Sequence, residues 1–150
     1  MAVELRALKA TESGIAAQMV GALIAELAPG YHPDLGAMTQ TAAGLLRQGR
    51  ILGLVAWEGD QPVGLLMLNE CAAIYAGGLF GEITELYVIP RMRSRGLAAQ
   101  MVARARDMGN ARGWKRLEVG APEQPVWART KVFYERQGFT EVGPRLKCLI

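Results

Sequence analysis

The sequence predicts an α/β fold in which a mixed β-sheet carries helices on both faces. Two observations lead to this class. Apolar runs of strand length outnumber segments of helical periodicity, and the strands are joined both by tight turns and through helices. The chain of 150 residues, 51% hydrophobic and 21% charged, has the composition of a globular protein that can bury a substantial core. We therefore expect one domain over residues 1–150.

The first half of the chain is expected to contain a strand, two helices and a two-stranded hairpin. Thr11 or Ser13 can cap the first helix, whose apolar residues repeat at helical spacing, and Pro29-Gly30 ends it. The turn at residues 58–60 separates the two strands of the hairpin. In order, these elements cover residues 3–7, 15–27, 38–48, 51–57 and 62–69.

The second half is expected to begin with a glycine-rich connection, residues 76–81, and to alternate strands and helices after it. Gly113 interrupts the first helical pattern, and Gly138 suits the left-handed conformation that ends many helices. Strands are expected at residues 82–89, 115–119, 139–142 and 145–149, and helices at residues 96–108 and 126–137.

The segment between the strand 82–89 and the helix 96–108 is the most informative part of the sequence. Pro90 ends an apolar run, Gly96 precedes the helix, and three arginines lie between them at positions 91, 93 and 95. The first N–H groups of a helix lack partners within it, and they carry the positive end of the helix dipole. Because Gly96 also permits a close approach, we predict a pyrophosphate site here. The P-loop and the three-glycine dinucleotide motif do not fit this segment.

Two motifs in this order resemble the GNAT family, the GCN5-related N-acetyltransferases. The first, Arg93-x-x-Gly96-x-Ala98, is similar to the pattern with which that family holds the pyrophosphate of acetyl-CoA. The second is Tyr134 followed by Gly138-Phe139, as in the last helix of family members. The resemblance implies a mixed, mostly antiparallel sheet of six to seven strands flanked by about four helices. It also implies an acetyltransferase that uses acetyl-CoA.

The resemblance assigns two stretches of backbone to this cofactor. The pantetheine arm would pair with the end of the strand 82–89, in a gap between that strand and the next one. The residues concerned are Leu86, Tyr87 and Val88. The pyrophosphate would meet the N–H groups of the following loop and helix start. These belong to Arg93, Ser94, Arg95, Gly96, Leu97 and Ala98.

Tyr134 and Glu85 are the catalytic residues that the resemblance suggests. Tyr134 would protonate the leaving thiolate, which requires good alignment because a phenol is a weak acid; the alternative is a core aromatic residue beside Phe133. Glu85 would take a proton from the amine, directly or through water, and the alternative is an edge salt bridge. Glu82 lies three residues away, so on a regular strand it faces the opposite side unless a bulge intervenes.

Residues near the acceptor are less well indicated. Tyr31 and His32 lie in the loop between the first two helices, where the family usually builds its acceptor wall, and Tyr75 is assigned to the same wall. Trp127 occupies a position at which the family often has Asn, which puts that cofactor contact in doubt. Trp127 could line the acceptor pocket, flank the pantetheine or pack in the core. Together with Glu82, these residues form the expected substrate site, for which a small cationic amine is favoured.

Three other functions remain open from the sequence. A non-catalytic module that binds or senses acyl-CoA would not need Glu85 and Tyr134. A protein N-terminal or lysine acetyltransferase would use the same cofactor. The clustered basic residues could bind nucleic acid, but the interleaved exposed aromatics of such proteins are missing, so no nucleic-acid partner is expected. Without a cysteine at a nucleophile position, direct transfer in a ternary complex is favoured over an acetyl-enzyme.

Composition limits the class of protein further. Cys71 and Cys148 lack His or Cys neighbours at metal-ligand spacing, so we expect no metal. No apolar run reaches the roughly 18 residues of a membrane span, and the first residues lack a signal-peptide core. We therefore expect a cytoplasmic protein without a membrane partner. The oligomeric state stays open, and a homodimer is one option.

Overall fold

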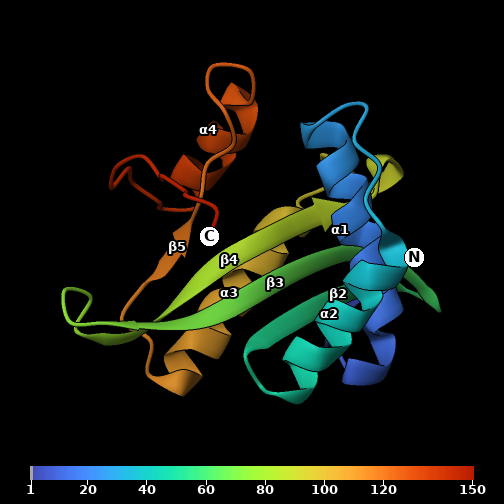
Figure 1. Cartoon of the computed structure of the whole chain (residues 1–150), viewed down its shortest axis with the longest axis horizontal. Helices are drawn as coiled ribbons and strands as arrows, with labels where there is room; N and C mark the ends of the chain where they lie inside the picture. Colours follow the sequence, from blue (N-terminus) through green and yellow to red (C-terminus); the bar gives the residue numbers. More distant parts are fainter. Residues whose placement is uncertain (1) are drawn as a thin grey trace.

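The computed structural model describes residues 2–150 and consists of one five-stranded sheet with helices on both faces (Figure 1). The strands are β1 (Val3–Ala7), β2 (Ile51–Glu58), β3 (Gln61–Ala73), β4 (Gly78–Val88) and β5 (Leu117–Val119). They lie in sequence order across the sheet; β1 to β4 are antiparallel, and β5 is parallel to β4. The predicted mixed, mostly antiparallel sheet is confirmed, with five strands instead of six or seven.

Four α-helices and two short 3₁₀ turns complete the part of the chain that the structure describes. They are α1 (Ser13–Leu27), α2 (Leu35–Arg47), α3 (Leu97–Arg112), α4 (Ala128–Arg136), η1 (Ala10–Glu12) and η2 (Pro90–Met92). Gly138 has a φ of 95° after Gln137, the C-cap of α4, and Gly113 has a φ of 78° after α3. Both glycines therefore end their helices in the left-handed conformation that was predicted for Gly138.

The two strands predicted at residues 139–142 and 145–149 are not formed. This segment is irregular, and its apolar side chains Val142, Leu146 and Leu149 are exposed. A strand needs a partner edge, and β5 is only three residues long. Ion pairs attach the segment instead. Glu141 pairs with Lys131 of α4 at 3.1 Å, and Arg145 pairs with Glu82 of β4 at 2.8 Å.

The glycine-rich stretch predicted as a connection belongs mostly to β4. β3 continues to Ala73, which pairs with Gly78, and a tight turn joins the two strands. Gly77 and Gly78 both have positive φ angles, which allows the chain to reverse there. β3 and β4 thus form a long hairpin whose tip projects at the left of Figure 1.

Each face of the sheet buries its own apolar cluster. On one face, Leu66, Leu68 and Ile83 pack against Met101 and Ala105 of α3, as the helical pattern of that segment predicts. The other face packs against α1 and α2. That second cluster contains Val55, Leu65, Met67, Tyr87 and Met19. The expectation of helices on both faces is confirmed. None of the helices in residues 2–150 is long and apolar enough to cross a membrane.

Candidate active site

The loop that opens α3 presents a group of backbone donors without acceptors. Among the described residues, the N–H groups of residues 94–98 donate no hydrogen bond. Ser94 has a φ of 62° and Gly96 a φ of 79°, so two left-handed residues turn the loop around these donors. A Cβ added at Gly96 would meet nothing within 4 Å. Such a concave set of N–H groups at a helix N-terminus suits an anion of phosphate type.

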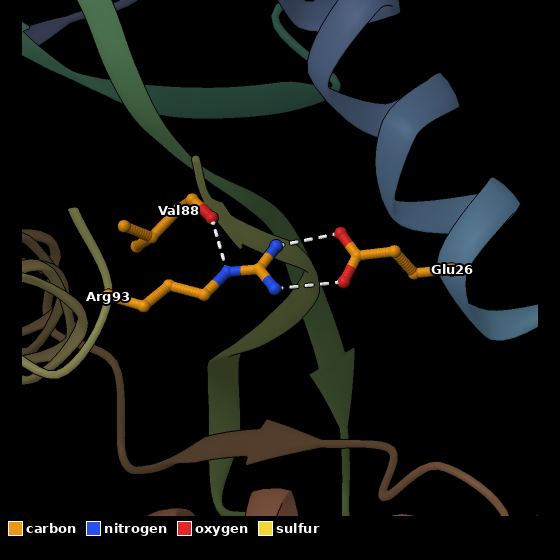
Figure 2. A network of polar contacts seen from close by, with 3 residues as sticks. All are labelled: Glu26, Val88 and Arg93. Carbon is orange, nitrogen blue, oxygen red and sulfur yellow. Dashed lines mark hydrogen bonds and ion pairs between the residues drawn. The ribbon is translucent and has the colours of Figure 1, made fainter. Parts of the chain in front are cut away.

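Arg93 differs from the expectation for this loop. Its N–H donates to the carbonyl oxygen of Pro90 at 3.2 Å and closes η2, so it is not free to meet a pyrophosphate. The guanidinium of Arg93 points away from the loop and bonds to Glu26 and Val88 (Figure 2). The donor group therefore begins at Ser94, because the backbone of Arg93 is used by the preceding turn.

The three arginines of this loop are not equivalent. Arg91 pairs with Glu58 at 3.0 Å and Arg93 pairs with Glu26 at 2.7 Å, so a carboxylate already balances each of these charges. Arg95 takes part in none of the ion pairs within residues 2–150, and its guanidinium approaches only the sulfur of Met92 at 4.0 Å. Arg95 is thus the arginine whose charge is available to a bound anion.

The C-terminal half of β4 has a free edge beside this loop. β4 pairs with β5 only from Gly81 to Ile83, and the strands separate beyond that point. On the other edge, the N–H of Ile89 donates to Val63 of β3 at 3.0 Å. In an antiparallel ladder alternate residues face the same neighbour, so Tyr87 also pairs with β3, whereas Leu86 and Val88 face the gap. Of the three residues predicted to pair with pantetheine, Tyr87 is therefore engaged by β3.

A β-bulge places both glutamates of β4 on one face. Met67 lies opposite Glu85 and Leu68 opposite Ile83, which leaves Thr84 as the extra residue. Glu82 lies opposite Asn69, on the same side of the sheet as Met67 and Glu85. Of the two alternatives for Glu82, a regular strand or a bulge, the structure therefore has the bulge, which brings Glu82 to the side of Glu85.

Glu85 and Glu82 have different surroundings. Burial raises the pKa of Glu85, the hydroxyl of Thr84 opposes this by donating to Oε2, and the negative charge of Glu82 raises it further. Glu82 instead pairs with Arg145 at 2.8 Å. Glu85 is the carboxylate that keeps a proton more readily than usual, which suits a group that exchanges protons near neutral pH.

Tyr134 is buried, with only 8% of its surface exposed. Its ring lies edge-on to Phe133 at 5.1 Å and to Phe139 at 5.5 Å, and burial raises the pKa of its hydroxyl to about 12. The hydroxyl makes no hydrogen bond within residues 2–150. Tyr134 therefore packs as a core aromatic residue and also retains an unused hydroxyl donor. Its position fits both the structural role and the role of proton donor.

A cavity of about 1250 Å³ lies between β4, β5, α4 and the irregular C-terminal segment. Tyr75, Glu82 and Tyr134 line it, together with Arg145. The structure thus brings Tyr134 to the same cavity as Tyr75 and Glu82, which lie far from it in the sequence.

The family model for the acetyltransferase (GNAT) domain matches residues 49–141, which include the loop, β4 and Tyr134. The chain belongs to the GNAT family. This match confirms the family resemblance and the class of enzyme, an acyltransferase.

The sequence is also similar to that of a named acetyltransferase. The chain is 34% identical over 118 residues to the mycothiol acetyltransferase of Beutenbergia cavernae. That match covers 75% of this chain, which spans only 37% of the relative's length.

Two solved structures share the fold. An aminoglycoside acetyltransferase from an uncultured soil sample is 20% identical, covers 100% of this chain and 99% of its own, and has a TM-score of 0.79. A predicted acetyltransferase from Clostridium acetobutylicum, solved with acetyl-CoA, is 16% identical, covers 99% and 96%, and has a TM-score of 0.81.

Three other residues predicted for the acceptor of this GNAT domain are not among those that line the cavity: Tyr31, His32 and Trp127. Tyr31 is 58% exposed and His32 is also exposed, both between α1 and α2. Trp127 is the residue before α4 and is half-buried. Tyr75 stacks under Arg116 at 5.0 Å in the turn before β4. β4 has eleven residues of about 3.3 Å each, so Tyr75 lies a strand length away from the α3 loop.

Sequence reasoning missed two charged residues of the site, Glu26 and Arg145. Glu26 lies on α1, 67 residues before its partner Arg93, and Arg145 lies in a segment predicted as a strand. No motif marks either one, because an ion-pair partner is set by packing and not by local spacing. Within residues 2–150, no His, Cys, Asp or Glu side chains form a group of three or more that could hold a metal ion.

Proposed function

We propose that this GNAT domain transfers the acetyl group of acetyl-CoA to a primary amine of a small molecule by direct attack in a ternary complex. The observation that carries the proposal is the free edge of β4 running directly into a loop of unpaired N–H donors. An extended amide chain that ends in a pyrophosphate matches both parts of this surface.

The residues present fit acetyl-CoA. The N–H groups of residues 94–98 would hold the pyrophosphate, with Arg95 adding charge, and the space above Gly96 admits it. The outward backbone groups of Leu86 and the N–H of Val88 would bond to the amides of pantetheine. The cofactor supplies an activated thioester carbonyl. Its alignment along β4 would bring that carbonyl toward the bulge at Thr84.

Glu85 would accept the proton of the ammonium group, directly or through one water. Its raised pKa makes it a better match to an amine than an ordinary carboxylate is, because the proton transfer is less unfavourable. The freed amine would then attack the thioester carbon, the C–S bond would break to release CoA as a thiolate, and the attacking nitrogen would lose its second proton to solvent.

Tyr134 would donate a hydrogen bond to the departing sulfur. The pKa of about 12 exceeds that of a free thiol, near 8.5, so complete proton transfer to the thiolate is unfavourable. A hydrogen bond from a buried donor still stabilises the charge that develops on sulfur. This role requires the hydroxyl, whereas the packing against Phe133 and Phe139 requires only the ring.

The small-molecule acceptor is supported by two features. Glu85 is half-buried at a strand bulge, where an extended peptide has less access than a small amine. The aminoglycoside acetyltransferase with the same fold is named for an acceptor of this kind. Arg145 balances the charge of Glu82, so a carboxylate on the acceptor could replace Glu82 as the partner of Arg145.

The test is release of CoA thiol from acetyl-CoA with amino acids, polyamines, aminoglycosides and peptides as acceptors. We expect turnover with at least one class of small amine, and a decrease of roughly 10²-fold in Tyr134→Phe without loss of stability. Turnover with peptides alone would identify a protein acetyltransferase. No turnover with any amine, while acetyl-CoA still raises the melting temperature, would identify a binding or sensing module.

A further inference from the structure

Arg93 joins three separate parts of the molecule through one guanidinium group (Figure 2). Its Nη1 and Nη2 donate to the two carboxylate oxygens of Glu26 at 2.9 and 2.7 Å. Its Nε donates to the carbonyl oxygen of Val88 at 2.8 Å, and the group lies 5.3 Å from the ring centre of Tyr87. A planar fork with fixed donor directions holds all three at once, which a lysine cannot do.

The contact with Val88 sets the geometry of the cofactor site. Val88 is the last residue of β4 and faces its free edge, and Arg93 is the residue before the donor group 94–98. The bond from Nε therefore fixes the distance between the edge for pantetheine and the loop for the pyrophosphate. Both halves must keep this spacing to bind one cofactor molecule.

The contact with Glu26 extends the same bridge to the acceptor side. Glu26 lies in the last turn of α1, and the loop of residues 28–34 with Tyr31 and His32 follows directly. The ion pair therefore connects the residue before the donor group directly to the end of α1, from which that loop starts.

We propose that Glu26 and Arg93 are positioning residues that align the two halves of the acyl-CoA site and couple this site to the loop of residues 28–34. The inference rests on the proposed function, since it assigns the free edge and the donor group to acyl-CoA. Neither side chain needs to touch the reacting atoms. Their effect is to hold the surfaces that do.

The experiment measures binding of CoA by calorimetry in the wild type, Glu26→Gln, Arg93→Lys and the control Glu4→Gln. The control removes an exposed ion pair between Glu4 and Arg6 on β1, at 2.9 Å. We expect the dissociation constant to rise about tenfold in Glu26→Gln and Arg93→Lys, the effect of losing hydrogen bonds to a charged group, and to stay unchanged in Glu4→Gln. Arg93→Lys keeps the charge, so a purely electrostatic role would leave its affinity near the wild-type value.

Hydrogen exchange at saturating CoA supplies the second readout. We expect CoA to protect amides of residues 28–34 in the wild type and in Glu4→Gln, but not in Glu26→Gln or Arg93→Lys. Wild-type affinity in either bridge variant, or equal protection in all four proteins, would overturn the inference. A wild-type protein that does not bind CoA would instead refute the proposed function, and the inference with it.

Discussion

At the scale of single residues, the chemistry of the site depends on which carboxylates are compensated. Glu82 has Arg145 within ion-pair distance, and Glu26 has Arg93. Within residues 2–150, Glu85 has only the hydroxyl of Thr84 as a donor, and it lies close enough to Glu82 to be affected by its charge. An uncompensated, half-buried carboxylate lowers stability when it ionises, which is a cost that a structural residue would not need.

The dependence of stability on pH tests this environment. The pKa of Glu85 in the folded state lies above its ordinary value of 4.5, so the folded protein holds this proton more tightly than the unfolded chain. The contribution of Glu85 to stability is therefore fully present below the unfolded pKa and is lost as the pH rises through the folded pKa. We predict that Glu85→Gln is more stable than the wild type at pH 7 to 8 and that the difference disappears near pH 4.

Urea denaturation across this pH range measures the difference. Glu123→Gln is a suitable control, because Glu123 is exposed and forms none of the side-chain contacts found in residues 2–150. A difference between Glu85→Gln and the wild type that does not vary with pH would mean that Glu85 titrates like an exposed glutamate. Its assignment as the base would then lose its electrostatic support.

At the scale of elements, the loop between η2 and α3 holds its free N–H donors in a strained backbone conformation. Ser94 adopts a positive φ that residues other than glycine rarely take, and this conformation costs on the order of 1–3 kcal/mol. The surrounding loop maintains the conformation because Met92 is buried on one side and Leu97 on the other. Strain of this kind at a group of free N–H donors is typical of a ligand-binding loop.

The arginines of this loop provide a matched pair of variants. Arg91 is balanced by Glu58, whereas Arg95 is available to the anion, so we predict that Arg95→Gln weakens CoA binding roughly tenfold. Arg91→Gln should change the affinity by less than about twofold, and only Arg95→Gln should reduce the dependence of affinity on salt. Titrations at two salt concentrations distinguish these cases. Equal losses in the two variants would show that only the net charge of the loop matters.

At the scale of the whole molecule, Trp114 anchors the start of β5 to β4 and α3. Its ring lies across Gly81 of β4 and Gly109 of α3, and its Nε1 donates to Glu70 at 2.6 Å. Arg112 donates to the same carboxylate at 2.9 Å and lowers the pKa of Glu70. This anchor fixes the end of α3 and the start of β5, and therefore the gap along β4 in which the cofactor is proposed to lie.

The close approach at Gly81 leads to a stability prediction. A Cβ there would lie 2.2 Å from the Trp114 ring, which is rigid, so Gly81→Ala should lower the free energy of unfolding by about 1–3 kcal/mol. Gly44→Ala on α2 is the opposite case, because a Cβ added there would meet nothing within 4 Å. Since alanine loses less backbone entropy than glycine in a helix, this variant should raise the free energy of unfolding by roughly 0.5–1 kcal/mol. Chemical denaturation of both variants measures the two signs. An unchanged stability in Gly81→Ala would mean that Trp114 moves aside without cost.

The sequence by itself determined the features that depend on near neighbours. The order of elements from β1 to α4, the helix ends at Gly113 and Gly138, and the loop that leads from Pro90 through Gly96 into α3 all follow from local spacing and backbone preference. The GNAT motifs lie in these local segments. The family could be predicted from them for that reason, and so could the loop that leads into α3.

The tertiary structure decided the features that depend on distant partners. The bulge at Thr84 arises from pairing with β3, and it places Glu82 on the same side of the sheet as Glu85. The pairing of Arg93 with Glu26 joins residues that are 67 positions apart. The residues after Gly138 alternate like strands, yet they form none, because a strand requires a partner edge and a face to bury. Local pattern specifies what a segment is able to form, and packing specifies which side chains meet.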